Sequence, residues 1–179
     1  MKTFIALLRG INVSGQKKIK MAELRKSLTQ NGLENVQTYI QSGNIIFDSE
    51  VLDTSTLEHK IHDVIAKDFG FEVPTLVVSG NAIPKVMEAN PFAKKAEENK
   101  LYYVLLKQVP EKELVAQFEE LNFTNEDFHV TENCVYLMCK KGYGNAKLNN
   151  NLIERKLKVD ATTRNQKTML KLWEMSQKS

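Results

Sequence analysis

Cysteine is scarce in this chain, where only Cys134 and Cys139 occur among 179 residues. Two cysteines exclude a disulfide-dense scaffold, and they cannot complete a four-ligand zinc site without help from histidine. We expect both thiols to be reduced and to serve in packing. Because they lie five positions apart in one expected strand, their side chains should point to opposite faces and cannot pair with each other.

Long apolar runs are also missing. A membrane-spanning helix needs about 20 predominantly apolar residues, and no stretch approaches that length. The apolar stretch Thr3–Leu8 is too short for a signal peptide, Arg9 interrupts it, and no small-residue cleavage site follows. We therefore expect a cytoplasmic protein with no membrane association.

Several signatures of known chemistry are absent from the sequence, which contains no nucleophile elbow, no zincin helix and no EF-hand loop. His59 and His62 lie three apart on one expected helix with Asp63 nearby. No third metal ligand is evident, so we expect a solvated helix face there. We predict neither a metal nor a cofactor, and whether the protein is an enzyme stays open.

The overall composition is that of a globular protein, with 42% hydrophobic and 26% charged residues. The length fits one large domain or two small ones. Hydrophobic periodicity in the first part predicts a strand, a helix, two strands, a helix and a strand, at Thr3–Arg9, Met21–Leu28, Val36–Gln41, Asn44–Asp48, Leu57–Phe69 and Val73–Ser79. Ser55 with Glu58 matches a capping box, and Pro74 indicates an edge strand. This β-α-β-β-α-β order is that of a ferredoxin-like unit.

The second part repeats the order but ends differently. Its pattern predicts a strand, a helix, two strands and two helices, at Leu101–Lys107, Leu114–Leu121, Asp127–Thr131, Cys134–Lys140, Leu148–Leu157 and Asn165–Ser176. A helix thus stands where a fourth strand is expected. We predict an α+β protein of two ferredoxin-like subdomains with antiparallel sheets, at residues 1–90 and 100–179, joined by a polar connection at 91–99. Thr3–Arg9 and Leu101–Lys107 should be central strands.

Basic residues gather at the two ends of the chain. Residues 1–30 carry a net charge of +6 and residues 139–179 carry +7, whereas residues 31–138 carry −10. If the fold brings the ends together, their fields add and an anion-binding face results. If it does not, these are ordinary solvated helix faces, and both interpretations stay open.

The segment Gly10–Lys18 lies between a strand and a helix, where phosphate-binding loops lie. It is not a P-loop, because the lysine comes one residue late and no serine or threonine follows it. Two interpretations remain: a flexible basic loop, or a non-standard anion site that uses Arg9, Asn12, Lys17 or Lys18.

A second glycine segment, Lys141–Lys147, ends a strand and places Lys147 where a helix should open. A helix start attracts anions, although Gly142 and Gly144 also suit a simple strand end. Arg164 precedes the last expected helix, for which Thr163 or Asn165 is the expected N-cap. An arginine beside a positive helix end is unfavourable, and a bound anion would remove that conflict.

Aromatic residues are few in the expected central strands. Phe4 and Phe47 are the only aromatic residues in the two central strands of the first unit. This disfavours RNA binding by base stacking on the sheet. Tyr39 and Gln41 share a strand face just before Ser42-Gly43-Asn44, and we expect that face to border the basic loop.

The stretches LLRGINVSGQKKIKM and QTYIQSGNIIF, followed by GYGNAKL, IERKL and ATTRN, resemble the domain of unknown function 1697 family over nearly the whole chain. The resemblance implies a bacterial cytosolic protein of two ferredoxin-like subdomains, and it implies no known activity. The residues that match its motifs are Arg9, Gly10, Asn12, Gly15, Lys18, Tyr39, Gln41, Ser42, Gly43, Asn44, Lys147, Glu154, Arg155, Arg164 and Asn165. Ser14 stands where the family pattern usually has glycine, and Gln166-Lys167 stands where a tryptophan and an asparagine are common.

These features together predict a protein that binds an anionic, phosphate-bearing ligand, with a nucleotide or nucleic acid as the leading example, in a basic cleft between the subdomains. The expected ligand-binding residues are Arg9, Asn12, Lys18, Tyr39, Gln41, Asn44, Lys147 and Arg164. One alternative is an enzyme acting on a small phosphorylated substrate, with Glu154 or Tyr39 transferring a proton. Another is a structural or partner-binding protein that uses a sheet edge.

Overall fold

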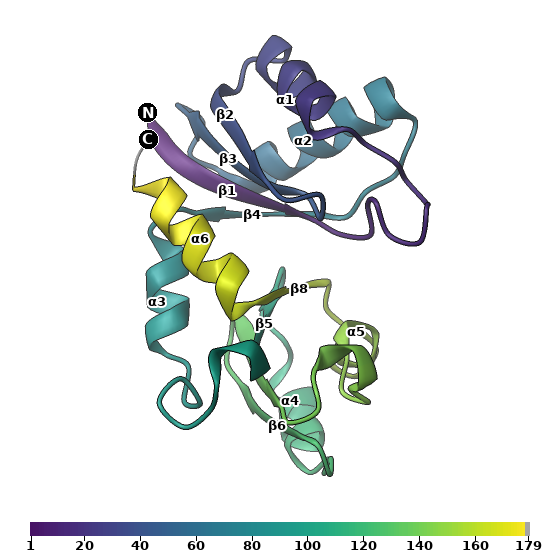
Figure 1. Ribbon diagram of the computed structural model, residues 1–179, viewed down its shortest axis with the longest axis vertical. Helices are drawn as coiled ribbons and strands as arrows, with labels where there is room; N and C mark the ends of the chain where they lie inside the picture. The colour runs from purple at the N-terminus through teal and green to yellow at the C-terminus, as the bar shows by residue number, and fades with distance from the viewer. Residues whose placement is uncertain (178–179) are drawn as a thin grey trace. The chain divides into compact units, whose positions relative to one another are not determined.

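The structure is a computed structural model, and it describes residues 1–177 of the chain. The chain divides into two compact units, one made of Met1–Ile83 with the C-terminal residues from Lys171, the other of Pro84–Leu170. Each unit contains one four-stranded antiparallel sheet. Figure 1 shows the course of the chain through both units. The domain boundaries expected from the sequence stay predictions. Residues 84–90 belong to the unit that contains the second sheet, and the end of the last helix belongs to the unit that contains the first sheet.

The first unit has the predicted β-α-β-β-α-β order. Its elements are β1 (Lys2–Leu8), α1 (Met21–Gln30), β2 (Glu34–Tyr39), β3 (Asn44–Ser49), α2 (Thr54–Phe69) and β4 (Thr75–Ser79). The strands lie in the order β2-β3-β1-β4, and α1 and α2 cover one face of the sheet (Figure 1). This is the ferredoxin-like arrangement. β4 lies at an edge, as Pro74 indicated.

Alternation along β1 explains how the helices attach. Phe4, Ala6 and Leu8 are buried in one cluster with residues of α1 and α2, including Leu24 and Ile61. The intervening residues of β1 are fully buried too, which is why the strand reads as a continuous apolar run in the sequence. Burying each large aliphatic side chain contributes about 1.5–3 kcal/mol, so the contact between this sheet and its helices stabilises the unit.

The start of α2 differs from the prediction. Asp53, not Ser55, is the N-cap, and its carboxylate accepts a hydrogen bond from the backbone N–H of Thr56 at 2.8 Å. Glu58 does not complete a capping box. Its buried carboxylate instead accepts from the backbone N–H of Val77 at 2.9 Å, because an edge strand such as β4 has outward N–H groups that need acceptors.

The second unit repeats this topology. Its elements are α3 (Ala82–Glu88, which begins in the first unit), a 3-10 helix (Glu98–Lys100), β5 (Leu101–Leu106), α4 (Lys112–Glu119), β6 (Glu126–Val130), β7 (Cys134–Cys139), a 3-10 helix (Tyr143–Asn145), α5 (Asn150–Leu157) and β8 (Ala161–Asn165). The strand order is β6-β7-β5-β8. β1 and β5 therefore occupy equivalent central positions, as predicted.

The fourth strand of the second unit corrects the sequence interpretation, which placed no strand after α5. β8 pairs with β5 from Ala161 opposite Leu106 to Asn165 opposite Tyr102. The last helix, α6 (Gln166–Ser176), follows at once. Asn165 caps it, since its side chain accepts from the backbone N–H of Thr168 at 2.8 Å. Both sheets are thus complete ferredoxin-like sheets, and the fold class is as predicted.

The two cysteines lie on β7 as expected. Cys139 packs in the cluster beneath the helices of the second unit, whereas Cys134 is five positions away and faces the other side of the sheet. Both are free and buried. Burial raises the pKa of the Cys139 thiol to about 11 and raises that of Cys134 further, so both are unreactive packing residues.

Candidate anion-binding site

The loop that follows β1 is closed at its base by one asparagine. The side-chain amide of Asn12 donates to the backbone carbonyls of Ile19 and Gln41, each at 2.9 Å, and its oxygen accepts from the N–H of Ile19 at 2.9 Å. Ile19 lies at the far end of the same loop and Gln41 in the β2–β3 turn. Asn12 therefore fixes the loop and attaches it to the neighbouring hairpin. The expected contact between the basic loop and Gln41 is therefore present, whereas the border with a strand face that includes Tyr39 stays a prediction.

The tip of this loop is a two-residue turn. Gln16 N–H donates to the Val13 carbonyl at 2.9 Å, and both central residues have positive φ, +50° at Ser14 and +75° at Gly15. Positive φ at both positions defines a type I′ turn. Within residues 1–177, the backbone N–H groups of Ser14 and Gly15 donate to no protein acceptor. Successive exposed N–H groups of this kind suit an anion.

Lys18 lies beside this turn. Its Cε is 4.0 Å from the position that a Cβ on Gly15 would take, so the lysine stem extends along the glycine. The side chain of Lys18 is exposed, and it forms no ion pair with any described residue. We call the segment Ser14–Lys18 the loop tip. It combines backbone donors with one cationic side chain.

The β2–β3 turn packs tightly against the end of β1. Leu8 N–H donates to the Gly43 carbonyl at 2.8 Å. Asn44 is fully buried, and its amide donates to the Tyr39 carbonyl at 2.9 Å and to Ser42 Oγ at 3.0 Å. Asn44 therefore shapes the turn from within.

The residues predicted in the first unit thus separate by role. Asn12 and Asn44 use their side-chain amides to hold backbone, whereas Lys18 and Gln41 are exposed and Tyr39 is half-buried. Gln41 lies in the turn after β2, not on the strand as predicted. The structure brings Asn12 and Gln41 into contact.

Two other basic residues near the loop form hydrogen bonds within the protein. Lys17 Nζ donates to the backbone carbonyl of Glu72 at 2.5 Å. Arg9 is partly buried, and its backbone N–H donates to the Pro74 carbonyl at 3.0 Å. Both residues therefore connect the region of the loop to the chain before β4.

In the second unit, the structure does not bring Lys147 and Arg164 to one place. Lys147 is exposed, and its backbone N–H donates to Glu126 of edge strand β6 at 3.1 Å. Arg164 lies on β8, the opposite edge strand, in register with Tyr103 of β5. Burial lowers the pKa of its guanidinium to about 10. It precedes α6 by two residues, so the predicted position near a helix start is correct.

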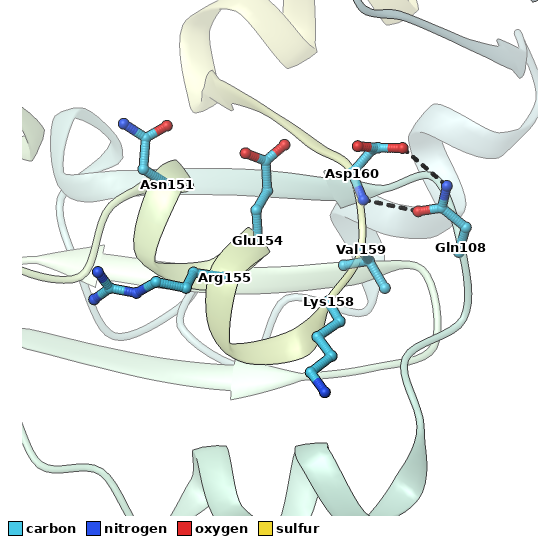
Figure 2. A pocket seen from close by; sticks show the side chains of 7 residues that line it. All are labelled: Gln108, Asn151, Glu154, Arg155, Lys158, Val159 and Asp160. Carbon is cyan, nitrogen blue, oxygen red and sulfur yellow. Dashed lines mark hydrogen bonds between the residues drawn. The ribbon is translucent and has the colours of Figure 1, made fainter.

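Glu154 belongs to a separate open pocket of about 420 Å³ in the second unit. Its lining is Gln108, Asn151, Glu154, Arg155, Lys158, Val159 and Asp160. Glu154 accepts a hydrogen bond from the Ala161 N–H at 2.8 Å, which ties α5 to β8. Figure 2 shows the side chain of Lys158 pointing away from the Glu154 carboxylate, so the polar groups of this pocket do not converge on one point.

Metal ligands are not gathered anywhere in residues 1–177, where no group of three or more histidine, cysteine or acidic side chains could hold an ion. In the same part of the chain, no helix is both long and apolar enough to cross a membrane.

The sequence interpretation missed a lysine-lined pocket in the second unit. Its lining includes Lys94, Lys95, Lys100 and Lys140. Of these, Lys94 and Lys95 belong to the segment that we expected to be a polar connection. The pair Lys94-Lys95 was a visible signal, but only the fold shows that a pocket forms beside it.

Both units are ferredoxin-like α+β units, and this fold defines the class of protein. The family described as "Protein of unknown function (DUF1697)" matches residues 1–136, so the chain belongs to this family. The solved structure of the conserved bacterial protein SP0830 from Streptococcus pneumoniae is similar to this chain. The two have 24% sequence identity, the TM-score is 0.75, and the match covers 98% of each chain. At that identity the likeness concerns the fold. No curated protein matches the sequence.

Proposed function

We propose that the protein binds an anionic, phosphate-bearing ligand, with a nucleotide or nucleic acid as the leading example, and that the loop tip supplies one of its contacts. The observation that carries this proposal is the type I′ turn at Ser14–Gly15, with two N–H groups that have no acceptor in residues 1–177 and with Lys18 beside them. Asn12 holds the turn in place before any ligand arrives. Such preorganisation reduces the entropy lost on binding.

The charge of the surrounding segment supports the same proposal. Residues 1–30 carry a net charge of +6, and a basic surface raises the local concentration of anions. Arg9, Tyr39, Gln41, Lys147 and Arg164 remain proposed ligand contacts, and the cytoplasmic location remains a prediction. Asn12 and Asn44 act in this proposal as positioning residues, because their amides hold the loop and the turn.

Titration of the full chain tests the proposal. Inorganic phosphate, nucleotides and short oligonucleotides are added while thermal unfolding is followed. A ligand at about 100 times its Kd adds about 2.7 kcal/mol of stability. Lys18→Gln should raise the Kd about tenfold, the size expected for one lost hydrogen bond to a charged group. Lys26→Gln is the matched control, because Lys26 is exposed on α1 and forms no ion pair with a described residue. Equal losses in both variants would contradict the assignment to the loop tip.

Ionic strength separates nucleic acid from a small ligand. A single-stranded nucleic acid releases counterions on binding, so log affinity should fall against log salt with a slope of roughly −0.7 for each phosphate neutralised. Oligonucleotide binding that does not change with salt would remove nucleic acid from the proposal.

A further inference from the structure

The lysine-lined pocket is a second basic feature, separate in the chain from the loop tip and contained in the second unit. It has a volume of about 450 Å³ and is lined by Lys94, Lys95, Ala96, Glu97, Lys100, Met138 and Lys140. Four of these seven side chains are cationic and one is anionic. Pockets that hold small ligands range from about 300 to 1,000 Å³, so the size suits a small molecule.

The segment that carries Lys94 and Lys95 is anchored to the core. Asn90 is buried, and its amide donates to the hydroxyl of the buried Tyr103 at 3.0 Å. The Asn90 oxygen accepts from the Phe92 N–H at 2.9 Å. Lys95 N–H then donates to the Phe92 carbonyl at 2.9 Å. The two lysines therefore extend from a turn whose backbone is held in place.

The positive charge of this pocket is only partly balanced within the protein. Lys100 Nζ lies 3.4 Å from Glu97 and Lys140 Nζ lies 3.2 Å from Asp127, and exposed ion pairs of this kind are weak. Lys94 and Lys95 form no ion pair with any residue in 1–177. Like charges held around one hollow repel one another, and an anion with several charges relieves that repulsion.

The chemistry of the lining identifies the kind of anion. The apolar residues are Met138 and Ala96, and no aromatic side chain is present on which a base could stack. Lysines are compact point charges that bind phosphate oxygens. We propose that this pocket binds a chain of linked phosphates, such as inorganic tripolyphosphate or the triphosphate of a nucleotide. This site is independent of the loop tip, so either one can fail without the other.

Isothermal titration of the full chain with sodium tripolyphosphate tests the proposal. The variant Lys94→Gln with Lys95→Gln removes two charges from the pocket. The control, Lys112→Gln with Lys156→Gln, removes two charges from exposed lysines of the same unit that have no ion pair with a described residue. The pocket variant should raise the Kd about tenfold or more, and the control should leave it nearly unchanged. Equal weakening in both variants would show a general charge effect and overturn the site.

Amide NMR spectra locate the binding. Tripolyphosphate should shift the amide signals of Ala96 and Met138 in the native chain and in the control, and should shift them much less in the pocket variant at the same concentration. The spectrum without ligand shows that each variant is folded. Shifts confined to Ser14 and Gly15 would support the loop tip and overturn the pocket.

A nucleoside triphosphate distinguishes the two sources of linked phosphates. Tripolyphosphate that binds at least as tightly as the nucleotide supports recognition of the phosphate chain alone. A nucleotide that binds where tripolyphosphate does not would overturn the proposal, because groups other than the phosphates would then carry the affinity.

Discussion

Gly43 allows the β2–β3 turn to lie directly against the end of β1. A Cβ at this position would be 2.6 Å from the Leu8 Cβ and 2.9 Å from the Ile11 Cδ1, and its φ is +85°. Real Cβ atoms do not approach buried neighbours so closely. The contact that attaches the turn to the loop through Asn12 therefore depends on this glycine.

We predict that Gly43→Ala destabilises the protein more than Gly10→Ala does. Both positions have positive φ, at +85° and +77°, but nothing lies within 4 Å of a Cβ on Gly10. The left-handed backbone costs about 1–2 kcal/mol at either site, and overpacking adds roughly 1–3 kcal/mol at Gly43 alone. Denaturant unfolding of the two variants measures the difference. Equal losses would show that the turn moves away without cost.

Helix α2 is tied to the chain before β4 by a histidine. His62 Nε2 lies 2.6 Å from Glu72 Oε2, and Nδ1 lies 3.1 Å from Asp63 Oδ1. The imidazole donates hydrogen bonds to both carboxylates. The bond to Asp63 and, after it, the bond to Glu72 raise the pKa of His62 above its ordinary value of 6.5, while burial opposes the shift. The backbone carbonyl of Glu72 also accepts a hydrogen bond from Lys17 of the loop after β1. The contact between His62 and Glu72 therefore helps to hold the residue to which that loop is attached.

This raised pKa predicts a pH dependence of stability. The folded state binds the His62 proton more tightly than the unfolded chain does. The stabilisation by protonated His62 is therefore complete below its ordinary pKa of 6.5. It is lost as the pH rises through the raised pKa of the folded protein. His62→Gln should lower the free energy of unfolding more at about pH 5.5 than at about pH 8.5. The difference should be about 0.2–1 kcal/mol, the range for exposed ion pairs. NMR titration of the imidazole checks the cause, and a midpoint at or below the ordinary value would contradict it.

For the whole molecule, basic side chains proposed as ligand contacts lie in both units, with Arg9 and Lys18 in the first and Lys147 and Arg164 in the second. That Arg9 and Arg164 contact one and the same ligand stays a prediction, and a double-mutant cycle tests it.

We predict that Arg9→Gln and Arg164→Gln each weaken binding of the phosphate-bearing ligand that the titration of the full chain identifies. We also predict that the effects of the two substitutions are coupled. Side chains that share one ligand give an interaction free energy of about 0.5 kcal/mol or more in a double-mutant cycle. Titration calorimetry of the native chain, the two single variants and the double variant supplies the four values. Strictly additive losses would indicate two independent contacts.

Most of the fold could be predicted from the sequence. Periodic apolar residues identified all six elements of the first unit. In the second part of the chain they identified β5, α4, β6, β7 and α5, and also the last helix, α6. β8 was missed because ATTRN has no apolar alternation. It becomes a strand by pairing with β5, which supplies the hydrogen bonds that its own sequence does not specify. The cap of α2 was misplaced because Asp53 and Ser55 are both suitable N-caps.

Less of the candidate site could be predicted. The positions of the basic residues and glycines along the chain are enough to locate the loop tip as a candidate site. The folded chain was needed to show that the amides of Asn12 and Asn44 hold backbone groups, that Lys17 contacts Glu72, and that Lys94 and Lys95 line a pocket. The physical reason is range. Periodicity and turn chemistry act between near neighbours, whereas these contacts join residues up to 55 positions apart and form only when the chain has folded.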